Sequence, residues 1–196
     1  GEVQWMTAAA GILHKEYLEE EFSAAGGDFQ MVQLWVNLPA RHKMSAPKYQ
    51  GITRDQISRY PLPDGGGHIE VIAGNYQGVA GAASTFTPVH LLNAHLHAGA
   101  TAEFSFPDYY NTALLVVEGS IRIKNKKKVP TDNFALFDTD GEHFSISALE
   151  NAVVLVLSGE PILEPIAAQG PFVMNTRAEL AQAFEDFHRG KFGHLT

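Results

Sequence analysis

The sequence predicts an all-β fold that ends in one α-helix, and three observations lead to this expectation. Of the 196 residues, 45 % are apolar and 18 % are charged, an ordinary globular balance with enough apolar side chains for a core. From residue 68 onward, short runs of β-forming residues alternate with turn signals at regular spacing, which is typical of a β-sandwich or barrel. One segment near the C-terminus has helical periodicity instead.

The N-terminal stretch alternates between candidate strands and turns. We expect strands at Val3–Thr7, Ile12–Glu16 and Phe29–Leu38, and a turn of small residues at Ala8–Gly11. The acidic run Glu19–Glu21 is expected to be a solvated loop.

Residues 39–67 have the composition of a connector, because they hold four prolines and end in three consecutive glycines. We expect an ordered excursion between two domains. The dense β pattern then begins, with strands expected at Ile69–Ala73, Leu91–His97, Thr112–Val117, Ser120–Lys124, Asn133–Phe137, His143–Ser147 and Val153–Leu157.

The predicted helix begins after Thr176. Thr176 and Glu179 have the spacing of a capping box, and Gly190 is a suitable residue for the C-terminal end. An apolar stripe at helical spacing predicts a packed face, made of Leu180, Ala183, Phe184 and Phe187.

Composition excludes several functions. The net charge of −8 argues against direct contact with nucleic acid, and the basic run Lys124–Lys128 is interpreted as a solvated turn between two strands. The absence of cysteine excludes disulfides and thiolate chemistry, so a metal ion would need His, Asp or Glu ligands. No apolar run has the length of a membrane span and no signal peptide is visible, so we expect a soluble cytoplasmic protein.

The sharpest chemical pattern is the triplet His14-Lys15-Glu16. On an extended strand, residues two apart share a face, so His14 and Glu16 would project together. An imidazole and a carboxylate suit Fe, Mn, Ni or Zn. The alternative is an exposed surface pair, and two ligands alone do not complete a metal site.

Three other patterns are weaker. His95 and His97 have a common ligand spacing, but we interpret them as exposed residues that bind no metal. His143, in the run Asp140–His143, is expected to start a strand. The glycines at 65–67 precede a strand and not a helix, so they lack the context of a phosphate-binding loop.

Together these segments resemble the signatures of the pirin family of bicupins, in order along the chain. The matching stretches are Gly1–Ala8 (GEVQWMTA), Gly11–Glu16 (GILHKE), Gln33–Pro39 (QLWVNLP), Lys43–Met44, Pro47–Gln50 (PKYQ), Gly159–Pro161 (GEP), Glu164–Pro165 and Gly170–Thr176 (GPFVMNT). The resemblance implies two cupin-type, double-stranded β-helix (jelly-roll) barrels and a C-terminal helical tail.

On this basis we expect residues 1–67 to hold the remainder of the N-terminal cupin and the connector, 68–160 the C-terminal cupin and 161–196 the tail. The first barrel would be truncated, because the chain begins at Gly1 and runs directly into the apolar segment Val3–Met6. An open half barrel would make an oligomer or a complementing chain a partner.

The resemblance also implies a metal in the first barrel, held by three His and one Glu, with none in the second. His14 and Glu16 match one His and the Glu. Fe2+, or Mn2+, Ni2+, Cu2+ or Zn2+, is expected for the intact site, and the truncated chain could lack it.

The activity implied is that of a quercetin 2,3-dioxygenase, which opens a flavonol ring with O2. Glu16 would be the catalytic base, and activity is expected to be impaired in this chain. The alternative is a non-enzymatic, iron-dependent transcriptional co-regulator or protein-binding module, whose acidic charge would suit a basic protein partner.

Overall fold

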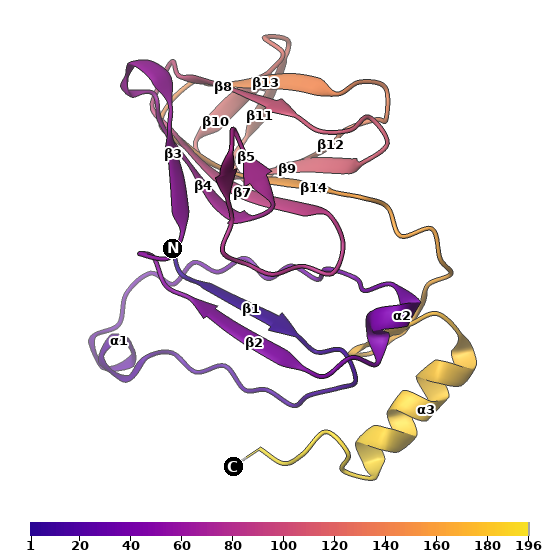
Figure 1. The fold of residues 1–196 in the computed structure, drawn as a ribbon. Coiled ribbons are helices and arrows are strands. Elements are labelled where there is room, and N and C mark those ends of the chain that lie inside the picture. Colours follow the sequence, from indigo (N-terminus) through magenta and orange to yellow (C-terminus); the bar gives the residue numbers. More distant parts are fainter. Residues whose placement is uncertain (196) are drawn as a thin grey trace. The chain divides into compact units, whose positions relative to one another are not determined.

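The computed structural model describes residues 1–195 and divides into two compact units, each described here by itself (Figure 1). The first, which we call the barrel unit, comprises Gly1–Trp5 and Tyr49–Pro161. The second, the tail unit, comprises Met6–Lys48 and the chain from Ile162 onward.

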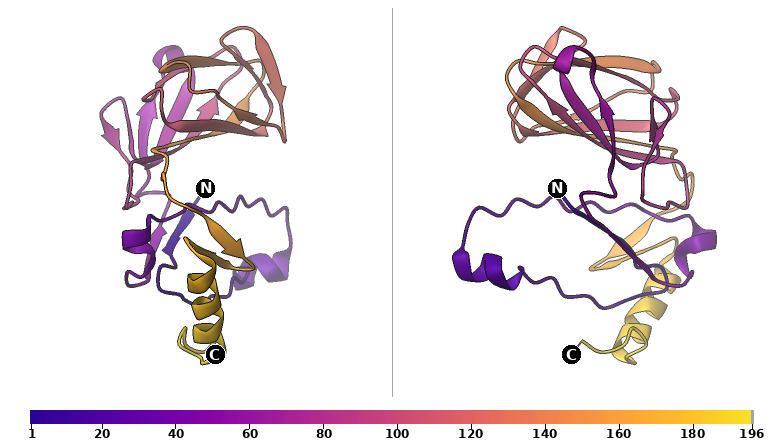
Figure 2. Two further views of the ribbon diagram at one scale, coloured as in Figure 1. Left: turned by 90° about the vertical axis from the view of Figure 1, so that its right-hand side faces the viewer. Right: turned by 60° about the vertical axis from the view of Figure 1, so that its left-hand side comes forward.

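The barrel unit consists of two antiparallel sheets that face each other (Figures 1 and 2). The six-stranded sheet has the order β12-β9-β14-β7-β4-β3 and the four-stranded sheet the order β11-β10-β13-β8. Their strands are β3 (Ser58–Pro61), β4 (Gly67–Ala73), β7 (Val89–Leu96), β8 (Thr101–Ser105), β9 (Asn111–Glu118), β10 (Ser120–Ile123), β11 (Lys127–Pro130), β12 (Phe134–Leu136), β13 (His143–Ala148) and β14 (Ala152–Gly159).

Smaller elements complete this unit. Strand β1 (Val3–Thr7), which begins in the barrel unit, pairs with β2 (Lys48–Ile52), and β5 (Asn75–Tyr76) pairs with β6 (Val79–Ala80). A 3-10 turn, η1 (Pro63–Gly65), precedes β4. The connector expected at residues 39–67 therefore contains regular structure.

The main core lies between the two sheets, because alternate residues of each strand point inward. Along β14, the buried residues alternate with partly exposed ones. Fully buried side chains come from both sheets, among them Leu92 and Val154 from one and Ile121 and Ile146 from the other. The all-β prediction and all seven strands predicted after residue 68 are confirmed.

The turn between β9 and β10 requires glycine. Gly119 has φ of +71°, and a Cβ atom there would lie 2.2 Å from the carbonyl oxygen of Asn151. Any side chain would therefore collide with backbone, and only glycine allows the chain to pass so closely.

The tail unit has less regular structure. It holds α1 (Glu20–Ala25), α2 (Ala40–Lys43), the paired strands β15 (Ala167–Gln169) and β16 (Phe172–Met174), and α3 (Arg177–His188). The capping box of α3 is confirmed: Thr176 Oγ1 accepts from the Glu179 N–H, and the Glu179 carboxylate accepts from the Thr176 N–H. Of the described helices, none has the length and apolar content to cross a membrane.

Three expectations for this unit are wrong. Ile12–Glu16 and Phe29–Leu38 are not strands, because no strand of the described chain pairs with them to satisfy their backbone groups. The acidic run is not simply a loop. Glu19 caps α1 by accepting hydrogen bonds from the N–H groups of Glu21 and Phe22, so the two acidic residues after it begin the helix.

Candidate metal centres

His14 and Glu16 lie in the irregular stretch of the tail unit. His14 Nδ1 is 3.6 Å from Glu16 Oε1, and the two side chains are 44 % and 42 % exposed. The sequence therefore predicts their proximity correctly, although they do not lie on a strand. Both side chains remain partly open to solvent.

A second cluster forms on the six-stranded sheet of the barrel unit. The pairing of β3, β4 and β7 sets Arg59 opposite Glu70, Glu70 opposite Asn93, and His68 opposite His95. The intervening residues of β4 and β7 point into the core, so the cluster occupies the opposite, outer face of the sheet.

Glu70 is the centre of this outer-face cluster. Its side chain is only 6 % exposed, and its Oε1 accepts from Arg59 Nε at 3.1 Å and Nη2 at 2.9 Å. Oε2 lies 3.1 Å from Asn93 Nδ2 and 3.2 Å from His95 Nε2. His68 Nε2 is 3.8 Å from Oε1.

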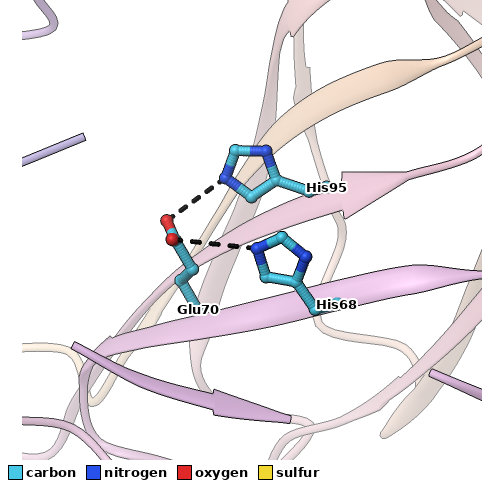
Figure 3. Close-up of side chains that lie close together, drawn as sticks. All are labelled: His68, Glu70 and His95. Atoms are coloured by element: carbon cyan, nitrogen blue, oxygen red, sulfur yellow. Dashed lines mark hydrogen bonds and ion pairs between the residues drawn. The ribbon is translucent and has the colours of Figure 1, made fainter. Parts of the chain in front are cut away.

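The two histidine rings lie side by side, as Figure 3 shows, with their centroids 4.7 Å apart and their planes within 13°. Each directs a ring nitrogen toward Glu70. One ligand atom from each of His68, Glu70 and His95 lies within 4.8 Å of the other two, so small side-chain movements would let all three hold one metal ion.

The electrostatics of the cluster follow from partial burial. Burial raises the pKa of Glu70, but His95, Asn93 and Arg59 together outweigh it and hold that pKa below its usual range. Burial, with a smaller contribution from the neighbouring His95, lowers the pKa of His68. Both shifts favour an ionised carboxylate and a neutral imidazole, the forms that bind metal ions.

Sequence reasoning missed this cluster. It interpreted His95 and His97 as exposed residues without a ligand role; His97 is exposed, with Nδ1 2.7 Å from the Gly65 carbonyl oxygen, but His95 is half-buried against Glu70. A signal was available, because His68-Ile69-Glu70 repeats the His-x-Glu spacing of the first pair. The register that adds His95 is a tertiary property and cannot be read from that spacing.

Other candidate residues stay outside these clusters. His143 begins β13 as predicted, and its side chain is 76 % exposed, 3.9 Å from Glu142. The basic run Lys124–Lys128 begins in the turn after β10, as predicted, but Lys127 and Lys128 already belong to β11.

Comparisons with known proteins agree with this description. The family model described as "Pirin" matches residues 1–36, and the model described as "Pirin C-terminal cupin domain" matches residues 91–193. His14 and Glu16 lie inside the first match, and His95 lies inside the second. The second match supports the predicted cupin type of the barrel.

Several relatives align over almost the whole chain. A Pseudomonas aeruginosa protein named "Putative quercetin 2,3-dioxygenase PA2418" is 44 % identical over 192 residues, which cover 98 % of this chain and 67 % of that protein. "Pirin-like protein 2" of Arabidopsis thaliana is 34 % identical, with 98 % and 60 % covered. This chain thus spans roughly two thirds of the length of these relatives.

A solved structure is also very similar. The crystal structure of quercetin 2,3-dioxygenase from Acinetobacter baumannii matches with a TM-score of 0.95 and 43 % identity, covering 100 % of this chain and 68 % of the other. The predicted all-β, cupin-type fold with a C-terminal helix is therefore confirmed.

Proposed function

The chain belongs to the pirin family, and from this premise we propose that it is part of a metal-dependent dioxygenase of the quercetin 2,3-dioxygenase type. The substrate class would be a flavonol, opened with O2. The observation that carries the proposal is the pair of His14 Nδ1 and Glu16 Oε1, 3.6 Å apart in the segment that matches the family model.

The donor set of this pair fits the proposed metal. One imidazole nitrogen and one carboxylate oxygen are ligands that Fe2+, Mn2+, Ni2+, Cu2+ and Zn2+ all accept. Two ligand atoms at about 2.1 Å from one tetrahedral ion lie roughly 3.4 Å apart, close to the separation in the pair. A complete site needs three or four donors, so the others must come from outside the pair.

The chemistry that the metal ion supplies when bound is Lewis acidity, which favours the deprotonated flavonol. The residues of the chain have the remaining tasks. The Glu16 carboxylate, half open to solvent, would accept the proton of the flavonol 3-hydroxyl as general base. His14 would be a ligand of the metal ion through its imidazole.

The test is an aerobic assay of the intact protein, loaded with Fe2+ or Mn2+ and supplied with quercetin. We expect quercetin absorbance to fall together with dissolved O2, and neither to change without O2. The variants Glu16→Gln and His14→Ala should lower the rate at least about 100-fold, since the loss of outer-shell partners alone costs 10- to 100-fold.

The control is His143→Ala, which removes one partner of the exposed Glu142–His143 pair and should leave the rate unchanged. A metal-loaded intact protein that consumes no quercetin would overturn the proposal. If that protein instead held iron and formed a stable complex with a basic protein partner, the result would favour the co-regulator.

A further inference from the structure

We propose that His68, Glu70 and His95 bind one transition-metal ion such as Zn2+ on the outer face of the six-stranded sheet. This site would be separate from His14 and Glu16, and the proposal does not rest on the dioxygenase function. It rests on the geometry of the outer-face cluster and on the hydrogen-bond contacts of His95 and Asn93.

The fold itself makes the ligand atoms converge. His68 and Glu70 stand two residues apart on β4, and the register of β7 sets His95 directly opposite His68. The carboxylate is nearly buried and fixed, whereas the two imidazoles are 36 % and 35 % exposed. The rings can therefore turn toward a shared ion without disturbing the core behind the sheet.

Whether or not it carries a proton, His95 Nε2 has one unfavourable contact in this structure. This atom lies 2.9 Å from the Asn93 amide nitrogen, which is a donor, and 3.2 Å from Glu70 Oε2, which is an acceptor. If Nε2 carries a proton, it opposes the amide N–H; if it does not, its lone pair faces the carboxylate oxygen. A metal ion between Nε2 and Oε2 would accept a lone pair from each and relieve their mutual repulsion.

The other end of the Asn93 amide gives a related indication. Its Oδ1 is buried and has no hydrogen-bond partner in the described part of the chain. An orphaned buried acceptor is rare and needs an explanation, of which an ion is one. The two ends of an amide are nearly indistinguishable in shape, so turning the side chain over would present Oδ1 as a further donor atom beside His95 and Glu70.

Arg59 is the competitor of the metal ion in this arrangement. Its guanidinium holds Glu70 Oε1 through two hydrogen bonds and leaves Oε2 directed at His95. A cation bound at the carboxylate would be repelled by this neighbouring positive charge. Because the Arg59 side chain is 45 % exposed, it can move away into solvent. Arg59 therefore limits the affinity of the cluster for a metal ion.

This competition supplies the decisive experiment. Calorimetric titration of the metal-stripped intact protein with Zn2+ should show one equivalent that is lost in Glu70→Gln and weakened at least about tenfold in His68→Ala or His95→Ala. Arg59→Met, which keeps the apolar stem and removes the charge, should bind Zn2+ several-fold more tightly. If the cluster were only an ion pair, that variant would gain no affinity.

Two controls separate this site from others. The double variant His14→Ala with Glu16→Gln should keep the equivalent assigned to the outer-face cluster, and so should His143→Ala. In the double variant, Co2+ in place of Zn2+ should give a visible absorption spectrum, and this spectrum should disappear when His95→Ala is added. Since the histidine rings are partly exposed, His68→Ala serves as the variant that folds if Glu70→Gln does not.

The proposal is overturned if Zn2+ binds the His68→Ala and His95→Ala variants as it binds the unaltered protein. It is equally overturned if the only equivalent bound is the one that depends on His14 and Glu16.

Discussion

Two stretches of similar composition behave differently in the two units of this chain. In the barrel unit, β7 lies between β14 and β4, and its Leu92 is fully buried. In the tail unit, Phe29–Leu38 forms no strand, and Phe29, Met31 and Trp35 are 61 %, 57 % and 67 % exposed. Both stretches are rich in apolar residues.

The difference lies in the neighbours and not in the sequences themselves. A strand is stable where adjacent strands take up its N–H and C=O groups and where a second layer covers its apolar face. The residues of β7 have both kinds of partner, whereas Phe29–Leu38 has neither within the described chain. The apolar residues of β7 therefore contribute to stability, whereas those of Phe29–Leu38 stay largely exposed.

The largest expected effect comes from truncating one leucine in each stretch. Leu92→Ala should lower the free energy of unfolding by about 3.5 kcal/mol, because it removes a fully buried side chain and leaves a cavity. Leu34→Ala, at a position 39 % exposed, should cost less than about 0.5 kcal/mol. Urea unfolding measures both, and equal losses would contradict the comparison.

The second prediction compares two glycines with the same φ of +71°. A Cβ atom at Gly119 in the barrel unit would meet the Asn151 carbonyl oxygen, whereas at Gly26 in the tail unit no atom of the described residues lies within 4 Å. Gly26→Ala should cost about 2 kcal/mol through backbone strain alone, because φ of +71° with ψ of −179° is a conformation almost exclusive to glycine. Gly119→Ala should cost roughly 3 kcal/mol, since a collision with backbone adds to the strain of its positive φ. Thermal unfolding would show Gly26→Ala as the more disruptive change if the barrel turn were loose.

The extent to which the sequence predicts the fold follows the same division. The seven strands predicted after residue 68 are found, because alternation and turn residues agree with the pairing that forms; Val153–Leu157 falls within β14. Strands β3, β8 and β11, which are short strands of four or five residues, are not predicted from the sequence. The errors at Ile12–Glu16 and Phe29–Leu38 arise because propensity describes one strand, while a sheet needs two. The helix α3 is predictable for the opposite reason, since its capping box is local.

The two candidate sites also differ in how far the sequence predicts them. The proximity of His14 and Glu16 is predictable from their spacing, because any extended backbone puts residues two apart on one side. The meeting of His68 and Glu70 with His95 depends on the register of β4 against β7. No local pattern encodes that register, so a histidine 25 positions after Glu70 cannot be assigned to it from the sequence alone.

A third prediction concerns the local structure of the tail unit. Thr176→Ala removes the side chain that accepts the Glu179 N–H, and should cost about 1 kcal/mol and speed amide exchange in the first turn of α3. Glu185→Ala is the control, because its pair with Arg189 is exposed and contributes little. Unchanged exchange in Thr176→Ala would mean that packing, and not capping, holds the helix start.

The smallest expected effect is a pH dependence that arises in the barrel unit. His90 packs against Phe106 and Tyr110, with ring centroids 5.0 Å and 6.3 Å away. Burial lowers its pKa below the ordinary 6.5, and contact with the Asn75 carbonyl only partly opposes this shift.

The unfolded chain therefore binds the His90 proton more readily than the folded one. The stability that depends on neutral His90 is fully present above pH 6.5 and is lost as the pH falls toward the lowered folded pKa. In His90→Phe, the urea midpoint should therefore fall less steeply as the pH is lowered. The gain in the free energy of unfolding at acid pH should be smaller than the contribution of the α3 capping box. His143→Gln, at a side chain 76 % exposed, is the matched control. If the urea midpoint of His90→Phe fell more steeply with pH, the folded protein would stabilise the charged form of the His90 ring. The aromatic neighbours of this ring disfavour its charged form.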